Sequence, residues 1–157
     1  MKTKSETVIK TALILYIILM LWLLFGQRMG REPFGSYWEV VNSNINLIPF
    51  KTVKLFLKAI QGSFSDYAVY HSIINLAGNI IMFIPLGFFV PSVFSKYSSF
   101  SRCIFLISII IIAIEIIQLF TLLGSCDIDD FILNIVGAII GYGIFRIISR
   151  RENRWLN

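Results

Sequence analysis

Charged residues, histidines and cysteines are all scarce in this sequence, and each shortage excludes a class of protein. Only 15% of the residues are charged, against about 25% in soluble domains, which disfavours a water-soluble fold. There is one histidine, no HExxH motif and no phosphate-binding glycine loop, so the familiar hydrolase, metalloprotease and nucleotide sites are missing. Cys103 and Cys126 are expected at opposite ends of one helix, roughly 30 Å apart, which excludes a disulfide or zinc framework within one chain.

Long apolar runs dominate what remains. The sequence is 57% hydrophobic with a mean hydropathy of +0.79. Four runs are long enough to cross a hydrocarbon core of about 30 Å as helices: residues 8–25, 73–91, 104–123 and 132–148. We therefore expect an all-α polytopic membrane protein, with residues 1–157 forming a single membrane domain built on a four-helix bundle.

Basic residues gather at three places that an even number of spans puts on one side of the membrane. They precede the first span, separate the second from the third and follow the fourth (Lys2, Lys4, Lys10; Lys96, Arg102; Arg146, Arg150, Arg151, Arg154). The turn at residues 124–131 has three aspartates and no basic residue. The positive-inside rule then predicts that both termini are cytoplasmic and that residues 26–72 form an external loop. The net charge of +5 is assigned to this topology and to anionic lipids, with no nucleic-acid partner.

The first span is expected to be an uncleaved anchor. Its apolar run is too long for a typical signal peptide, and no small-x-small cleavage site follows it. It carries almost no polar residues, so it is assigned no chemistry.

The external loop contains a candidate interfacial helix. After Asn46-Leu47-Ile48-Pro49-Phe50, lysines recur at spacings of three and four among apolar residues (Lys51, Lys54, Lys58; Val53, Leu55, Phe56, Leu57, Ile60). This pattern predicts an amphipathic helix lying at the membrane surface, and Pro49 suits its start because a missing N–H costs nothing there. An ordinary solvated loop helix fits the same pattern.

Polar side chains interrupt three of the spans at similar depth. Asn79, Glu115, Gln118 and Asn134 are all expected in the outer half of the bilayer. The three amides fit interhelical hydrogen bonding equally well. Glu115 is different, since a carboxyl group within a span is a functional-site hypothesis by default. We expect it either to be neutral and hydrogen-bonded or to face a hydrated cleft.

Three aspartates crowd the connection between the last two spans, and three hypotheses fit them. Asp129 or Asp130 could cap the fourth span, because a carboxylate satisfies free N–H groups at a helix start. Asp127, Asp129 and Asp130 could instead bind a divalent cation, although their spacing is not that of an EF-hand. The third hypothesis is recognition of a cationic or hydroxyl-rich ligand.

Prolines and glycines in the second and fourth spans predict close helix contacts. Pro85 removes one backbone hydrogen bond and Gly87 follows it, which predicts a kink or the close approach of another backbone. Gly137 and Gly141 form a GxxxG pattern on the helix face that also carries Asp130 and Asn134.

Taken as a set, these motifs resemble the VanZ-like membrane proteins associated with resistance to the glycopeptide teicoplanin. The residues that carry the resemblance occur in the family's order: Asn46–Phe50, Asn79-x₃-Phe83-x-Pro85-x-Gly87, Glu115-x-x-Gln118, and Asp127-x-Asp129-Asp130-x₃-Asn134-x₂-Gly137-x₃-Gly141. An arginine often seen before the last motif in that family is replaced here by Gly124-Ser125-Cys126. The resemblance implies a bacterial cell membrane and a link to glycopeptide tolerance or cell-envelope precursors.

Two mechanisms remain open at this point. The first is a binding protein whose outward-facing acidic cleft engages the lipidated antibiotic or its lipid-linked cell-wall target. The second is an intramembrane enzyme that modifies a lipid-linked precursor, with Glu115 as general base and the aspartates holding a metal or a sugar hydroxyl. No cofactor is otherwise expected.

Overall fold

The computed structural model describes residues 2–26, 35–58 and 66–155, and it is an all-α membrane fold. Four of its helices are long and apolar enough to cross a membrane, over Glu6–Phe25, Ile73–Val93, Phe100–Phe120 and Ile128–Arg150. They belong to α1 (Lys2–Phe25), α4 (Asp66–Val93), α5 (Phe100–Phe120) and α6 (Ile128–Trp155). The predicted polytopic architecture is confirmed.

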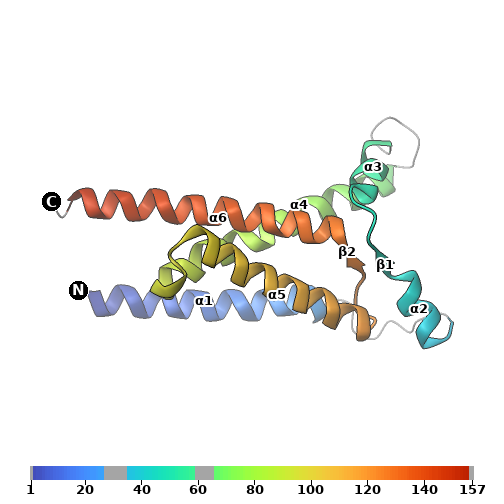
Figure 1. The fold of residues 1–157 in the computed structure, drawn as a ribbon, viewed down its shortest axis with the longest axis horizontal. Helices are drawn as coiled ribbons and strands as arrows, with labels where there is room; N and C mark the ends of the chain where they lie inside the picture. The colour runs from blue at the N-terminus through green and yellow to red at the C-terminus, as the bar shows by residue number, and fades with distance from the viewer. Residues whose placement is uncertain (1, 27–34, 59–65, 156–157) are drawn as a thin grey trace.

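The short elements gather at one end of the bundle, which we call the loop end (Figure 1). It carries α2 (Tyr37–Ser43), α3 (Lys51–Lys58) and two short strands, β1 (Ile45–Asn46) and β2 (Cys126–Asp127). The two chain ends lie together at the opposite end, where a 3-10 turn (Ser95–Tyr97) joins α4 to α5. The predicted loop helix therefore exists as α3.

α3 has the predicted polar face, since Lys51, Lys54 and Lys58 are all exposed on it. Val53 is partly buried and Leu57 is half exposed. The side chains of Leu55 and Phe56, and all of Ile60, lie outside the described part of the chain.

Helix boundaries differ from the sequence prediction where capping groups act. α6 starts at Ile128, four residues earlier than residue 132, so Asp129 and Asp130 are in its first turn and not in a loop. α5 ends at Phe120, three residues earlier than residue 123. It closes with the two hydrogen bonds of a Schellman motif, from Leu123 N–H to Gln118 O (3.0 Å) and from Leu122 N–H to Leu119 O (3.2 Å), with Leu122 left-handed at φ 57°.

The closest packing in the bundle is between α4 and α6, where the predicted glycine contacts are confirmed. A Cβ at Gly87 would overlap the carbonyl of Ala138, and one at Gly137 would overlap the carbonyl of Ile80. A Cβ at Gly141 would meet the backbone of α4 in the same way. α4 is helical through Pro85. Of the two features predicted there, the close approach of another backbone is observed at Gly87.

The buried core lies beside this contact and is wholly apolar at its centre. Phe83 of α4, Ile107 and Ile111 of α5 and Ala138 of α6 are almost completely buried. α1 joins the core through Met20, and its Tyr16 hydroxyl donates a 2.7 Å hydrogen bond to the Met82 carbonyl of α4. The bundle thus fixes α4, α5 and α6 as a packed unit and attaches α1 along α4.

Candidate functional site

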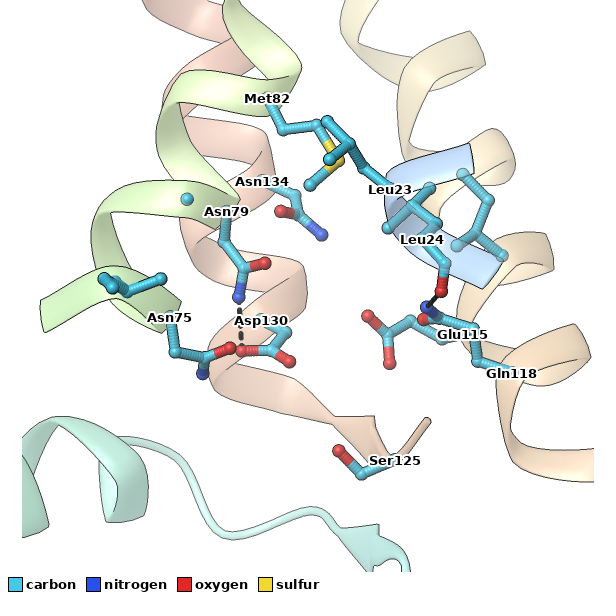
Figure 2. Close-up of a pocket in the computed structure, with 13 residues that line it drawn as sticks. Leu23, Leu24, Asn75, Asn79, Met82, Glu115, Gln118, Ser125, Asp130 and Asn134 are labelled. Atoms are coloured by element: carbon cyan, nitrogen blue, oxygen red, sulfur yellow. Dashed lines mark hydrogen bonds between the residues drawn. The ribbon is translucent and has the colours of Figure 1, made fainter. Parts of the chain in front are cut away.

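A polar cavity of about 120 Å³ lies between the four long helices at the loop end. Figure 2 shows amide and carboxyl groups from three helices surrounding it. Its lining residues come from α1 (Leu23, Leu24), α4 (Ile74, Asn75, Gly78, Asn79, Met82), α5 (Ile114, Glu115, Gln118), the α5–α6 connection (Ser125) and α6 (Asp130, Asn134). Among the residues that the structure describes, carboxyl groups are present in this lining and basic side chains are not.

Most of the residues singled out in the sequence meet in this cavity. Asn79, Glu115, Gln118, Asp130 and Asn134 all line it, which agrees with their expected common depth. Asp127 and Asp129 do not line it. The aspartate motif is therefore divided between the cavity and the structure around it.

Asn79 and Asp130 form a hydrogen-bonded pair between α4 and α6. The Asn79 amide Nδ2 donates to Asp130 Oδ1 (Figure 2). Asn75 lies one turn before Asn79 and also faces the cavity. Because the glycine contacts hold α4 against α6 just beyond this pair, the two side chains are kept within bonding distance.

Glu115 and Gln118 connect α5 to its neighbours. Buried Glu115 accepts a 3.2 Å hydrogen bond through Oε2 from the backbone N–H of Asp127. Gln118 Nε2 donates a 3.1 Å hydrogen bond to the Leu24 carbonyl at the end of α1. α1, assigned no chemistry from its sequence, thus contributes a wall of the cavity.

Asn134 brings to the cavity a buried amide oxygen that has no hydrogen-bond partner among the described residues. The residue is only 4% exposed, and Oδ1 accepts no hydrogen bond. Figure 2 shows its amide extending from α6 toward the space between α4 and α1. Leaving such a buried group unsatisfied costs about 1–3 kcal/mol, so a hydrogen-bond donor placed beside it is favoured.

Asp127 anchors the segment that carries β1 to the start of α6. β1 pairs in parallel with β2, with Ile45 opposite Cys126 and Asn46 opposite Asp127. Asn46 Nδ2 donates to Asp127 Oδ2 at 2.9 Å. Asp127 Oδ1 accepts from the Asp129 N–H at 2.8 Å, so the cap of α6 is made by Asp127 and not by the two later aspartates.

Asp129 stabilises α3 from outside that helix. It is 1% exposed, and its carboxylate accepts hydrogen bonds from the backbone N–H groups of Phe50 and Val53. The Val53 N–H belongs to the first turn of α3 and the Phe50 N–H directly precedes that turn, so the carboxylate also meets the positive end of the helix dipole. Pro49 precedes this turn, and Phe50 adopts a left-handed φ of 62° between them.

The three aspartates consequently have three different partners. Asp127 binds Asn46 and its own helix start, Asp129 binds α3, and Asp130 binds Asn79. Within the described residues, no three His, Cys, Asp or Glu side chains come together as a metal-binding group. The geometry favours a structural role for Asp127 and Asp129.

Comparison with known proteins gives the family. The model of the VanZ/LLP1 family matches residues 13–149, which is most of the chain. The chain belongs to the VanZ/LLP1 family. It is 25% identical to "Protein VanZ" of Enterococcus faecium over 143 residues, covering 90% of this chain and 76% of that protein. No solved structure matches.

The family assignment and the four apolar helices together make this a multi-pass membrane protein. The motifs that carried the resemblance to VanZ-like proteins have distinct places in the fold. The cavity is surrounded by the polar motif residues Asn79, Glu115, Gln118, Asp130 and Asn134. The α4–α6 contact is formed by Gly87, Gly137 and Gly141. The segment from β1 to α3 contains Asn46 and Pro49. The motifs of the VanZ-like pattern thus either line one cavity or hold together the elements around it.

Several lining residues were missed in the sequence. Asn75 had a usable signal, its spacing of four from Asn79, which places both on one helix face. Ser125 and the leucines at the end of α1 had none, because their position depends on how the helices pack.

Proposed function

We propose that this VanZ-family protein lowers the susceptibility of a bacterial cell to teicoplanin by binding an amphipathic ligand in the polar cavity. The ligand is the lipidated antibiotic or its lipid-linked cell-wall target, and binding changes the access of one to the other. The unpartnered oxygen of buried Asn134 carries the proposal, since a preformed polar cavity with an unsatisfied group favours an incoming hydrogen-bond donor.

The proposal places the loop end outside the cell and both termini in the cytoplasm. Charge supports this orientation: the end with the chain termini carries Lys10, Arg102, Arg146 and Arg150, whereas the α5–α6 connection is acidic. A cavity at the loop end would then open where cell-wall precursors and antibiotics meet.

Charge inside the cavity supports the kind of ligand proposed. Glu115 and Asp130 lie in it, and its described lining residues include no basic side chain. A head group with hydroxyl or ammonium donors is complementary to this surface, and an anionic head group is repelled. Ligand recognition is also favoured over catalysis because hydrogen bonds to Asn79 and to the Asp127 N–H tie Asp130 and Glu115 into the fold.

The test compares teicoplanin susceptibility in a sensitive Gram-positive host expressing matched membrane levels of each variant. Wild type should raise the inhibitory concentration, and Glu115→Gln and Asp130→Asn should return it to that of the empty vector. Glu6→Gln, an exposed site at the other end of α1, is the matched control and should behave as wild type. Full resistance in both cavity variants would refute the proposal.

A second measurement separates binding from catalysis. Purified protein is incubated with lipid-linked precursor and analysed by mass spectrometry, and teicoplanin affinity is measured on the same preparation. The proposal expects an unchanged precursor mass together with saturable binding of teicoplanin or of the precursor. A mass-shifted product would replace it with the enzymatic mechanism.

A further inference from the structure

An apolar groove of about 390 Å³ lies between α1 and α4, directly beside the polar cavity. The groove and the cavity share three lining residues, Leu23, Gly78 and Met82. Gly78 has no side chain at this junction, and a Cβ there would meet nothing within 4 Å. The two spaces are therefore adjacent parts of one continuous surface.

We infer that the cavity and the groove together bind one single-chain amphiphile, with its head in the cavity and its hydrocarbon chain between α1 and α4. The inference rests on the function proposed above and narrows it. The head carries hydroxyl or ammonium donors and is joined to the chain without a phosphate. Of the two ligands proposed above, this chemistry describes the lipidated antibiotic.

The direction of the groove supports an amphiphile. α1 runs toward the loop end and α4 runs away from it (Figure 1). Leu23 and Gly78 therefore mark the end of the groove at the cavity, while Tyr16 and Pro85 mark the end nearer the middle of the bundle. A bound chain would leave the head group near the membrane surface and extend toward the bilayer centre, as lipid chains do.

The length and chemistry of the groove fit a short alkyl chain. Seven helical residues separate Leu23 from Tyr16, and seven separate Gly78 from Pro85, which is about 10 Å at 1.5 Å per residue. That is roughly the length of an eight-carbon chain built from C–C bonds of about 1.5 Å. The Tyr16 hydroxyl is occupied by the Met82 carbonyl, so the groove presents an apolar surface along this length.

The charge of the cavity selects the head group. A phosphate at the junction would approach the carboxyl groups of Glu115 and Asp130, and none of the described lining residues is a lysine or arginine. A sugar or an amine would instead donate to these carboxyl groups and to the free oxygen of Asn134. The acidic cavity thus favours an uncharged or cationic head, and the apolar groove favours a single hydrocarbon chain.

The experiment uses the full chain in phosphatidylcholine nanodiscs and a decyl glucoside with a photoreactive diazirine near the end of its chain. After illumination, mass spectrometry should locate the cross-links at groove residues such as Leu19, Met20 and Ile81. Teicoplanin should compete for this labelling, and a phosphate-linked precursor should not. Cross-links spread evenly over all lipid-facing helix surfaces would show ordinary lipid contact and overturn the inference, as would competition by the precursor alone.

Gly78→Leu is the decisive variant, because it adds a side chain at the junction and its Cβ would meet nothing within 4 Å. It should weaken decyl glucoside binding by about tenfold, which corresponds to roughly two buried methylenes displaced. Gly143→Leu is the matched control, since a Cβ at Gly143 also meets nothing within 4 Å and that residue borders neither space. Equal binding by the two variants would overturn the inference.

A second pair of variants tests the groove alone at exposed positions, where folding is not at risk. Ile81→Trp should reduce labelling by the decyl probe, whereas Ile109→Trp, on an exposed face of α5, should not. Failure of the inference is separable from failure of the proposed function. If the cross-links are uniform but Asp130→Asn still loses resistance, only the binding of a chain in the groove is rejected. If the cross-links are specific to the groove but Asp130→Asn and Gly78→Leu keep full resistance, only the resistance mechanism is rejected.

Discussion

The α4–α6 contact makes a strong prediction at Gly137. A Cβ added there would overlap the carbonyl oxygen of Ile80 and lie 3.0 Å from its carbon, whereas ordinary contacts begin at 3.4 Å. The obstacle is backbone, so the helices must separate before an alanine fits, and by more than the 0.4 Å (3.4 minus 3.0) that the carbonyl carbon alone requires, because the oxygen is closer still. Overpacking of this kind costs roughly 1–3 kcal/mol.

The matched control is Gly143→Ala, on the same helix at a position open to at least 4 Å. There the substitution only improves helix propensity, by up to about 1 kcal/mol. The two changes are chemically identical and are expected to have opposite signs. At roughly 2–4 °C per kcal/mol for a chain of this size, Gly137→Ala should lower the Tm by about 2–12 °C and Gly143→Ala should leave it unchanged or slightly raised.

The assay is fluorescence-detected size exclusion of a reporter fusion after heating in detergent. Resistance should fall as well, because Ile80 adjoins Asn79 and a separation of α4 from α6 lengthens the Asn79–Asp130 hydrogen bond. Equal Tm values for the two alanine variants would refute the account of backbone contact between these helices.

Three further predictions concern the loop end. With the native cysteines removed, Leu47→Cys should react with a membrane-impermeant maleimide on intact cells and Ser101→Cys should not; the reverse pattern would invert the proposed orientation. Asp129→Asn removes the charged acceptor from the start of α3, so limited trypsin digestion should cleave that helix faster, and unchanged cleavage would contradict the capping role. Burial, and then the carboxylates of Glu115 and Asp127, raise the pKa of the Cys126 thiol, so at neutral pH its thiolate fraction is lower than that of a free cysteine and its alkylation is slow. Alkylation of Cys126 should accelerate as the pH rises past the usual thiol range. At a fixed pH, Glu115→Gln should accelerate it, because the substitution removes one of the charges that raise the pKa of the thiol. An unchanged rate would show that this charge does not act on the thiol.

The fold and part of the cavity could be predicted because local patterns determine them. Apolar length gives the spans, and depth within a helix follows from the rise per residue, so Asn79, Glu115, Gln118 and Asn134 could be placed together. GxxxG spacing likewise marks a contact face before its partner is known. The orientation in the membrane also comes from sequence, and it stays a prediction.

The roles of Asp127 and Asp129 could not be predicted, since their partners lie far away in the chain. Asn46 is 81 positions from Asp127, and Phe50 is 79 positions from Asp129. Only the folding of the segment between α1 and α4 brings these groups together. Sequence reasoning therefore treated the three aspartates as one group, with helix capping, cation binding and ligand recognition all open, whereas Asp130 alone of the three faces the cavity.

The left-handed turn at the end of α5 restricts the conformation of the connection beside the cavity. Most helices that end in this way place a glycine at the left-handed position, and a leucine there costs about 1–2 kcal/mol. Leu122 nevertheless restricts the chain far more than glycine would, just before Ser125 reaches the cavity and Cys126 joins β1. The connection is preorganised, so a ligand of the kind proposed for the cavity would not have to order this segment on binding.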